Sequence, residues 1–504
     1  MVGRLAAVPE ESTTAAYSPR SLYRDLIRSV AVPGAQIRST LFSSNSQSGH
    51  GSSYSSCSRT SNSCPSHSSG CSSSGSSPPA AAADFRTQDL KTIARRMVSD
   101  GYTQHMVKAF NNASPARGVL ERLFFELDVD WVLQIHDQHG SQWQLQDKSA
   151  SSLQDLVERW TRGLTVIVHT IGELVFPDHN ELELEGVARF GKASIAEMLA
   201  FVDPIVAVLR AEKLQAVLDM YICVCASYMI IPVPMHTESR IVFVEIRSSL
   251  AREGNRLNGA IFSTMKEVRT LVEDDDLWAI DILRGRGEVH RNTRFMVDCI
   301  LYIQKAVAMM DRFATVDKNS SGLEGLISDT VGYLKDLLSR KSELCSDPSL
   351  RYLFLLNNSY FVQKLGEPSR SPIWYSSYAP NKIVQLTPDC EKYMHLYLEV
   401  SWGNVLACCM RKSRCCPGPM HRWINTTSSL AKFELAVRKT CQAHKFWKVP
   451  DPLLRNELRE VITARVVSGY RDYREEHPEL QKHVGHGSSS PEVIEEMLRE
   501  LFEG

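Results

Sequence analysis

The sequence predicts an all-α protein, an elongated rod of consecutive antiparallel helical bundles preceded by a disordered Ser-rich N-terminal tail. Apolar residues recur at helical spacing from about Asp84 to the end of the chain. Alternating strand patterns bounded by tight-turn signals are scarce, since Asn258-Gly259 is the only Asn-Gly pair and it opens a helix-like run. Many one-sided helices joined by short polar segments are typical of stacked bundles.

Residues 1–84 are expected to form the tail. Between Ser39 and Ser77, 20 of 39 residues are Ser, and such a stretch buries too little apolar surface to offset the entropy lost on ordering. Cys57, Cys64 and Cys71 fall in this tract, but their spacing of seven does not form the paired ligands of a zinc site. Before the tract, a short amphipathic piece predicts a transient helix on Leu22, Leu26, Ile27 and Val30.

Two helical regions are expected after the tail, a segment at 85–145 and a helical-bundle rod at 146–504. One apolar stripe predicts a continuous helix over Ile195, Met198, Leu199, Val202, Val206 and Leu209. The last helix is expected to begin at Ser490 as N-cap with Pro491 at its first position. Its predicted apolar face consists of Val493, Met497, Leu501 and Phe502.

Composition excludes several classes of protein. The 57 Lys and Arg nearly balance the 58 Asp and Glu, which argues against a nucleic-acid-coating protein. The most apolar stretch, from Met220 to Met235, is short and broken by Pro232 and Pro234. A membrane span needs about 18 apolar residues, so this stretch predicts a buried helix followed by a turn. The first residues of the sequence have no apolar segment, so no secretory signal is expected there.

A search for catalytic or metal-binding motifs favours structural interpretations. Gly285 and Gly287 lack the rest of a phosphate-binding loop and are expected to form a turn between helices. His290 is interpreted as a structural residue. A zinc site is the less favoured interpretation of Cys408, Cys409, Cys415, Cys416 and His421, because the spacing is unorthodox and the first two continue a helix. We therefore expect no enzymatic activity, no cofactor and no bound metal.

The balanced total charge hides a basic region. Between Val400 and Arg474 there are 14 basic and 5 acidic residues, a local net charge of 14 − 5 = +9, so the rest of the chain sums to −10. Two interpretations stand at this level. The region binds an anionic surface, either membrane or protein, or it is a solvated helix face with ion pairs of its own.

Short motifs in a fixed order then give a family resemblance. Phe446-Trp447-Lys448-Val449-Pro450-Asp451-Pro452, followed by Val466-Val467 and Tyr470, resembles a signature of the seventy-kilodalton exocyst subunit family. Upstream, Val289-His290 with Thr293-Arg294, Leu353-Phe354-Leu355-Leu356-Asn357-Asn358 and Ser401-Trp402 match in the same order. The ending Leu501-Phe502-Glu503-Gly504 is similar to that of the plant branch, so the chain resembles a divergent, N-terminally shortened plant member.

The resemblance implies a non-enzymatic exocyst subunit that helps tether secretory vesicles to the plasma membrane in exocytosis. It implies a cytoplasmic protein, peripherally associated with that membrane, whose partners are other exocyst subunits, small GTPases or immune-signalling proteins, and no nucleic acid. It also implies binding of phosphatidylinositol 4,5-bisphosphate through basic residues near the C-terminus. The candidate lipid contacts are Lys445, Lys448, Arg455, Arg459, Arg465, Arg471, Arg474 and Lys482.

One alternative follows from a departure from the family pattern. Family members usually carry a further N-terminal helical region that assembles with other subunits, whereas a Ser tract precedes Asp84 here. The alternative is a free-standing helical interaction scaffold, an immune or signalling adaptor, that no longer assembles into the exocyst.

Overall fold

The structure is a computed structural model of the 504-residue chain. It describes residues 23–31, 79–112, 117–137, 148–175, 181–207, 210–234, 239–313, 321–366, 385–410, 419–477 and 490–503.

The predicted all-α class is confirmed. Every regular element in the described ranges is a helix, and β pairing there is limited to one isolated antiparallel bridge between Lys448 and Glu503. The chain divides into two compact units, Met1–Thr264 and Met265–Gly504. This division falls at 264/265 and does not test the domain boundaries expected at 84/85 and 145/146, which stay predictions.

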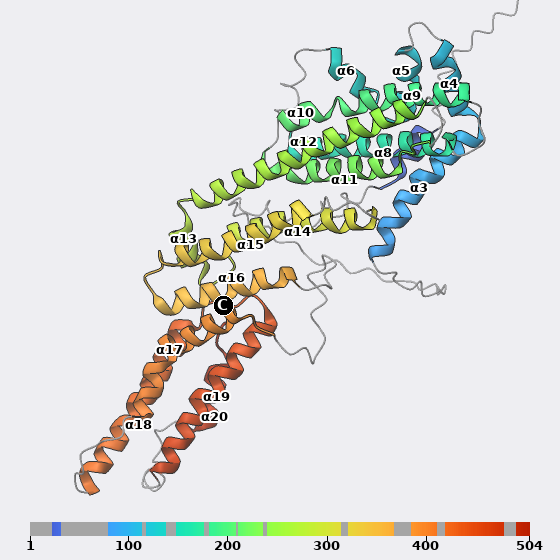
Figure 1. The fold of residues 1–504 in the computed structure, drawn as a ribbon. Helices are drawn as coiled ribbons and strands as arrows, with labels where there is room; N and C mark the ends of the chain where they lie inside the picture. The colour runs from blue at the N-terminus through green and yellow to red at the C-terminus, as the bar shows by residue number, and fades with distance from the viewer. Residues whose placement is uncertain are drawn as a thin grey trace, which may run out of the picture. The chain divides into compact units, whose positions relative to one another are not determined.

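The first unit is built around one long helix, α8, which packs against α3, α9 and α11 (Figure 1). Trp160 of α8 is fully buried and its indole N–H donates to the carbonyl of Met198, 2.7 Å away. The helices of this unit are α1 (Arg24–Ser29), α3 (Pro79–Ser99), α4 (Tyr102–Asn112), α5 (Arg117–Glu126), α6 (Trp131–Asp137), α8 (Ala150–Val175), α9 (Glu181–Leu199), α10 (Val202–Ala207), η2 (Ala211–Lys213) and α11 (Leu214–Ile230), and α12 (Arg240–Glu273) begins in it.

The second unit pairs successive helices, with α14 against α15, α15 against α16, α16 against α17 and α17 against α18 and α19. Trp402 and Tyr470 are among its large, fully buried side chains. Its helices are α13 (Trp278–Gly285), α14 (Arg291–Phe313), α15 (Ser321–Ser342), α16 (Pro348–Gln363), η3 (Lys364–Gly366), α17 (Pro388–Met410), α18 (Pro419–His444), α19 (Pro452–Glu476) and α20 (Pro491–Arg499).

The apolar stretch from Met220 lies in α11 as predicted, and the helix ends at Ile230, just before Pro232. Ten of its side chains are buried on several sides, which is typical of a core helix rather than a surface one. Among the described residues, no helix combines the length and apolar character needed to cross a membrane.

The continuous helix predicted from Ile195 to Leu209 is wrong, because the structure breaks it after Leu199 into α9 and α10. Pro204 explains the break. Within a helix its ring would clash with the carbonyl of Ala200, and it has no N–H to donate. Val202 and Ile205 of α10 are buried. The apolar pattern in the sequence therefore continues across the break.

The last helix begins at Pro491 as predicted, and Ser490 occupies the N-cap position, although its side chain makes no capping hydrogen bond. The predicted apolar face is partly wrong. Val493 is exposed, while Ile494 and Leu498 are buried. The helix ends at Arg499, and the buried Phe502 lies beyond it with a φ of 63°.

Within the range expected to be tail, the structure describes a docked helix, α1, and a helix start at Pro79. The predicted short helix near Ile27 is therefore present, and Ile27 and Val30 are buried. The remainder of the predicted tail, including the Ser tract with Cys57, Cys64 and Cys71, lies outside the described residues.

Candidate functional site in the basic C-terminal region

Helix α19 carries most of the predicted basic residues, and its start is fixed locally. The side chain of Asp451 accepts hydrogen bonds from the backbone N–H groups of Leu453 (3.0 Å) and Leu454 (3.2 Å), and Pro452 occupies the first helical position. One face packs against α17 and α20. That face consists of the buried residues Leu454, Leu458, Ile462, Val466, Val467, Tyr470 and Tyr473.

Lys448, predicted to contact lipid, is held in the connection before α19. Its backbone N–H donates to the carbonyl of Arg286 (2.8 Å), and its own carbonyl accepts from the side-chain amide of Asn357 (2.9 Å). The same amide donates to the carbonyl of Gly287 (2.6 Å), and the Lys448 ammonium pairs with Glu288 (3.0 Å). Lys448 therefore joins three segments that are far apart in the sequence.

Asn358 extends this network. Its side-chain oxygen accepts from the backbone N–H of His290 (3.0 Å) and from the hydroxyl of Thr293 (2.7 Å), and its amide donates to the carbonyl of Phe354 (2.8 Å). The His290 ring stacks on Trp278 with centroids 3.8 Å apart. Burial lowers the pKa of His290 to about 4, so the ring is neutral at pH 7, which agrees with its interpretation as a structural residue.

The three motifs around His290, Asn357 and Lys448 thus meet in one hydrogen-bonded junction. Gly287 lies at its centre with a φ of 92°, and a Cβ there would lie 3.0 Å from Leu353 and 3.2 Å from the Lys448 carbonyl. The Gly285–Gly287 segment forms the predicted turn between helices. These residues maintain the fold of the second unit.

Three further predicted residues are also engaged within the protein. Arg455 donates from Nε to the carbonyl of Val449 (2.9 Å). Arg459 donates from Nε to the carbonyl of Leu501 (2.8 Å) and forms an ion pair with Glu503. Lys445 lies 3.5 Å from Glu500, with both side chains about half exposed. Arg455 and Arg459 therefore secure the segments on either side of α19.

Arg465, Arg471 and Arg474 lie on the second half of α19, on its outer sides. Arg465 and Arg471 are exposed, and Arg474 is half-buried with its guanidinium 5.8 Å from the Tyr470 ring. Arg471 and Arg474 are three residues apart and so share a helix face. Hydrogen bonds from its own backbone N–H and from Ser490 lower the pKa of Glu492, and the charges of Arg471 and Arg474 lower it further.

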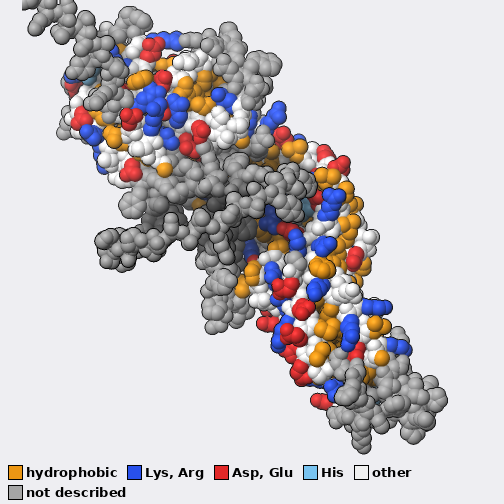
Figure 2. Space-filling view, turned by 180° about the vertical axis from the view of Figure 1, so that it is seen from behind, with side chains coloured by type: hydrophobic (Ala, Val, Ile, Leu, Met, Phe, Trp, Pro, Cys, Tyr) orange, Lys and Arg blue, Asp and Glu red, His pale blue; other side chains and the backbone are white. Residues whose placement is uncertain are grey.

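Lys482 lies outside the described residues. Sequence reasoning found the cations but did not identify Glu288, Asn357 and Glu503 as residues that contact Lys448 and Arg459. Figure 2 shows Lys and Arg side chains interspersed with Asp and Glu on the face it presents. The cations of this region whose side chains the structure describes are therefore divided between ion pairs and exposed groups.

Of the five candidate ligands of a zinc site, the structure describes only the side chain of Cys408. The Cys408 thiol donates to the carbonyl of Asn404 (3.3 Å), as a structural cysteine does in a helix. The side chains of Cys409, Cys415, Cys416 and His421 lie outside the described residues. Across the described ranges, no group of three His, Cys, Asp or Glu side chains is placed to hold a metal ion.

Fold and site together define an all-α protein with a hydrogen-bonded junction and exposed cations on its penultimate helix. Residues 161–500 match the family described as the C-terminal region of the Exo70 exocyst complex subunit. This match covers more than half of the chain, which therefore belongs to the Exo70 exocyst subunit family.

Three relatives from Arabidopsis thaliana match 82% of the chain. They are the exocyst complex components EXO70A1 (23% identical, 66% of its length), EXO70B1 (23%, 66%) and EXO70B2 (24%, 68%). The chain thus spans about two thirds of the length of these relatives. A crystal structure of the Saccharomyces cerevisiae exocyst component Exo70p aligns with 82% of this chain and 81% of its own, at 12% identity and a TM-score of 0.34.

Proposed function

We propose that this protein is a non-enzymatic exocyst subunit that helps tether secretory vesicles to the plasma membrane. In this proposal the second half of α19 contacts a membrane that contains phosphatidylinositol 4,5-bisphosphate. Membership in the exocyst subunit family supports the assembly, because the matched relatives are named as exocyst complex components.

The proposed membrane contact is supported by one observation. Some of the predicted cations are held by contacts within the protein, whereas others are exposed. Lys448, Arg455 and Arg459 donate to backbone carbonyls or acidic side chains of the protein and cannot turn toward a membrane without breaking these contacts. Arg465 and Arg471 are exposed, and Arg474 is half-buried on the helix face of Arg471. These three, with Lys482, form the proposed contact set.

The proposed binding is electrostatic and peripheral. Each Lys or Arg near an anionic leaflet contributes about 1 kcal/mol, so Arg471 and Arg474 together contribute about 2 kcal/mol. This corresponds to a factor of roughly 30 in the membrane partition constant. The attraction falls off within a Debye length, about 10 Å at 0.1 M salt, so binding is expected to weaken as salt rises.

Co-sedimentation with liposomes tests this proposal. Arg471→Glu combined with Arg474→Glu should reduce binding to vesicles containing phosphatidylinositol 4,5-bisphosphate by a factor of roughly 30 or more. A matched control, Lys108→Glu with Lys266→Glu, makes the same change in net charge at exposed positions of other helices and should bind nearly as the unmodified protein does. Equal binding by both double variants would refute the assignment of α19.

A further inference from the structure

The segment Tyr23–Val30 is seated on the first unit like a bound peptide. Its helix α1 has six residues, and Tyr23, Ile27 and Val30 are buried. Tyr23 and Ile27 are four residues apart and so lie on one helix face. Helix α1 packs against α3 and α8, and its Arg24 lies over the ring of Phe125 in α5. The next described residue along the chain after 31 is at position 79.

Polar contacts orient the aromatic anchor of this segment. The backbone N–H of Tyr23 donates to the carboxylate of Glu126 (3.0 Å), which belongs to α5. The Tyr23 hydroxyl donates to Asp100 (3.0 Å), and the Tyr23 ring lies against Tyr102 with centroids 5.3 Å apart. The groove thus recognises a tyrosine through its ring, its hydroxyl and its backbone.

A buried carboxylate recognises the basic side of the same segment. Asp128 lies two residues after the end of α5 with a φ of 62°, and the N–H of Val129 donates to the Phe124 carbonyl (2.9 Å) in a Schellman-type turn. The Asp128 side chain is 3% exposed and pairs with Arg24 (2.8 Å), Arg28 (2.7 Å) and Arg159 (2.8 Å). Two of its three cationic partners therefore come from α1.

The environment of Asp128 shows how much it depends on these cations. Burial alone would raise the pKa of this carboxyl, but the hydrogen bond from Arg28 and the charges of Arg159, Arg28 and Arg24 outweigh that effect and hold the pKa below its usual range. Without α1, the buried carboxylate would retain Arg159 and lose two charge-assisted contacts. The position beside the Asp128 carboxylate therefore favours a ligand that carries positive charge.

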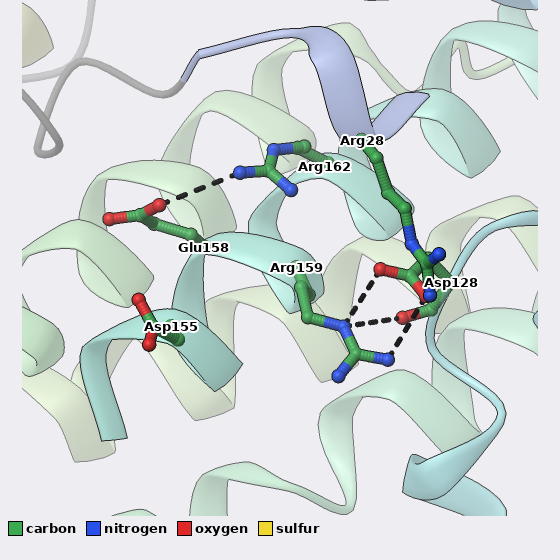
Figure 3. Close-up of a pocket in the computed structure, with 6 residues that line it drawn as sticks. All are labelled: Arg28, Asp128, Asp155, Glu158, Arg159 and Arg162. Atoms are coloured by element: carbon green, nitrogen blue, oxygen red, sulfur yellow. Dashed lines mark hydrogen bonds and ion pairs between the residues drawn. The ribbon is translucent and has the colours of Figure 1, made fainter. Parts of the chain in front are cut away.

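The seat of α1 borders a cleft, whose lining residues Figure 3 shows as sticks. Arg28 of α1 points to Asp128 beside Arg159, and these three residues line a cleft of about 300 Å³ with Asp155, Glu158 and Arg162. Arg28 is itself 49% exposed. A side chain of the docked helix thus forms part of the rim of this cleft.

A six-residue helix is too short to be stable on its own, and a Ser-rich sequence separates it from Pro79. We propose that the groove formed by α3, α5 and α8 is a docking site for a short amphipathic helix, and that residues 23–30 are its releasable ligand in the same chain. The recognised pattern is a Tyr followed by an Arg one residue later, an Ile four residues later and a second Arg five residues later, as in Tyr23, Arg24, Ile27 and Arg28. Because ligand and groove belong to one chain, their association is intramolecular.

Peptide binding to the full chain tests this proposal. The probe is a fluorescent synthetic peptide of residues 20–33, and binding is followed by fluorescence anisotropy. Arg24→Glu with Arg28→Glu places two carboxylates against Asp128 and should vacate the groove. The peptide should then bind this variant at least tenfold more tightly than it binds the unmodified chain, whose groove is occupied. Adding Asp128→Asn to the vacated variant should weaken peptide binding at least tenfold.

Controls keep the outcome interpretable. Lys266→Glu with Lys439→Glu changes the net charge equally at exposed positions of the second unit and should leave peptide binding as weak as in the unmodified chain. Should Arg24→Glu with Arg28→Glu fail to fold, Tyr23→Ala with Ile27→Ala vacates the groove by removing its apolar anchors. Equal peptide binding by the vacated and unmodified chains would overturn the proposal. A dimeric unmodified chain that exchanges this segment between copies would overturn docking within one chain.

Discussion

Replacing Asn358 with Ala removes the most connected side chain of the junction in the second unit. Asn358 is fully buried. It accepts from the His290 N–H and the Thr293 hydroxyl, and donates to the Phe354 carbonyl, at 3.0, 2.7 and 2.8 Å. Alanine keeps the backbone of α16 helical but makes none of these hydrogen bonds.

The expected loss follows from these contacts. Each buried hydrogen bond contributes about 1 kcal/mol net, and a buried donor left without an acceptor, here the His290 N–H, costs about 1–3 kcal/mol. The higher helix propensity of Ala offsets about 0.5 kcal/mol. Asn358→Ala should therefore lower the free energy of unfolding of the second unit by about 3 kcal/mol, or lower its Tm by about 6–12 °C for a unit of this size.

Thermal denaturation followed by circular dichroism measures the loss, and hydrogen exchange in α14 and α16 assigns it to the second unit. The two compact units can unfold separately, so the local probe is needed. Asn404→Ala, an exposed position on α17, should change stability by less than about 0.5 kcal/mol. A loss below about 1 kcal/mol for Asn358→Ala would refute the claim that the junction holds this unit together.

Three further predictions concern His444, Gly287 and the ion pair between Arg459 and Glu503. Burial lowers the pKa of His444 to about 3. Between about pH 6.5 and 3 the unfolded chain therefore carries a proton on this ring that the folded chain does not, and the free energy of unfolding should fall as the pH drops through this range. His444→Phe should flatten that part of a stability–pH profile, and the exposed His395→Gln should not. Gly287→Ala should destabilise the second unit by about 1–3 kcal/mol in urea unfolding, since its φ is 92° and a Cβ would crowd Leu353. A double-mutant cycle of Arg459→Gln and Glu503→Gln should give a coupling of about 0.5–1 kcal/mol, as expected for a partly exposed pair.

The helical class was predictable because it depends on a local signal. Apolar residues repeated every three or four positions report one buried face of a helix wherever they occur. The wrong continuous helix at Ile195–Leu209 shows the limit of this signal, because the pattern persisted across a break. Pro204 was the available clue, since a proline inside a helix conflicts with the carbonyl four residues before it.

The candidate site was less predictable because its residues are defined by distant partners. Lys448 pairs with Glu288, 160 positions away, and Arg459 donates to the Leu501 carbonyl, 42 positions away. A window of about 11–18 residues, the length over which a helical pattern is read, contains neither pair. Charge alone therefore identified eight cations of one kind, whereas packing separates those that hold the fold from those that face outward. The seat of Tyr23 was missed for the same reason, because Asp100, Glu126 and Asp128 lie far along the chain.

Recovery of the protein with its partners from native tissue tests the central claim most directly. A tagged full chain expressed at its natural level should co-purify with other exocyst subunits, identified by mass spectrometry, at salt low enough to preserve the complex. Arg471→Glu with Arg474→Glu should leave this recovery unchanged, because the proposal assigns these residues to membrane contact. Efficient recovery of the chain with no other exocyst subunit would contradict the account and favour a free-standing scaffold.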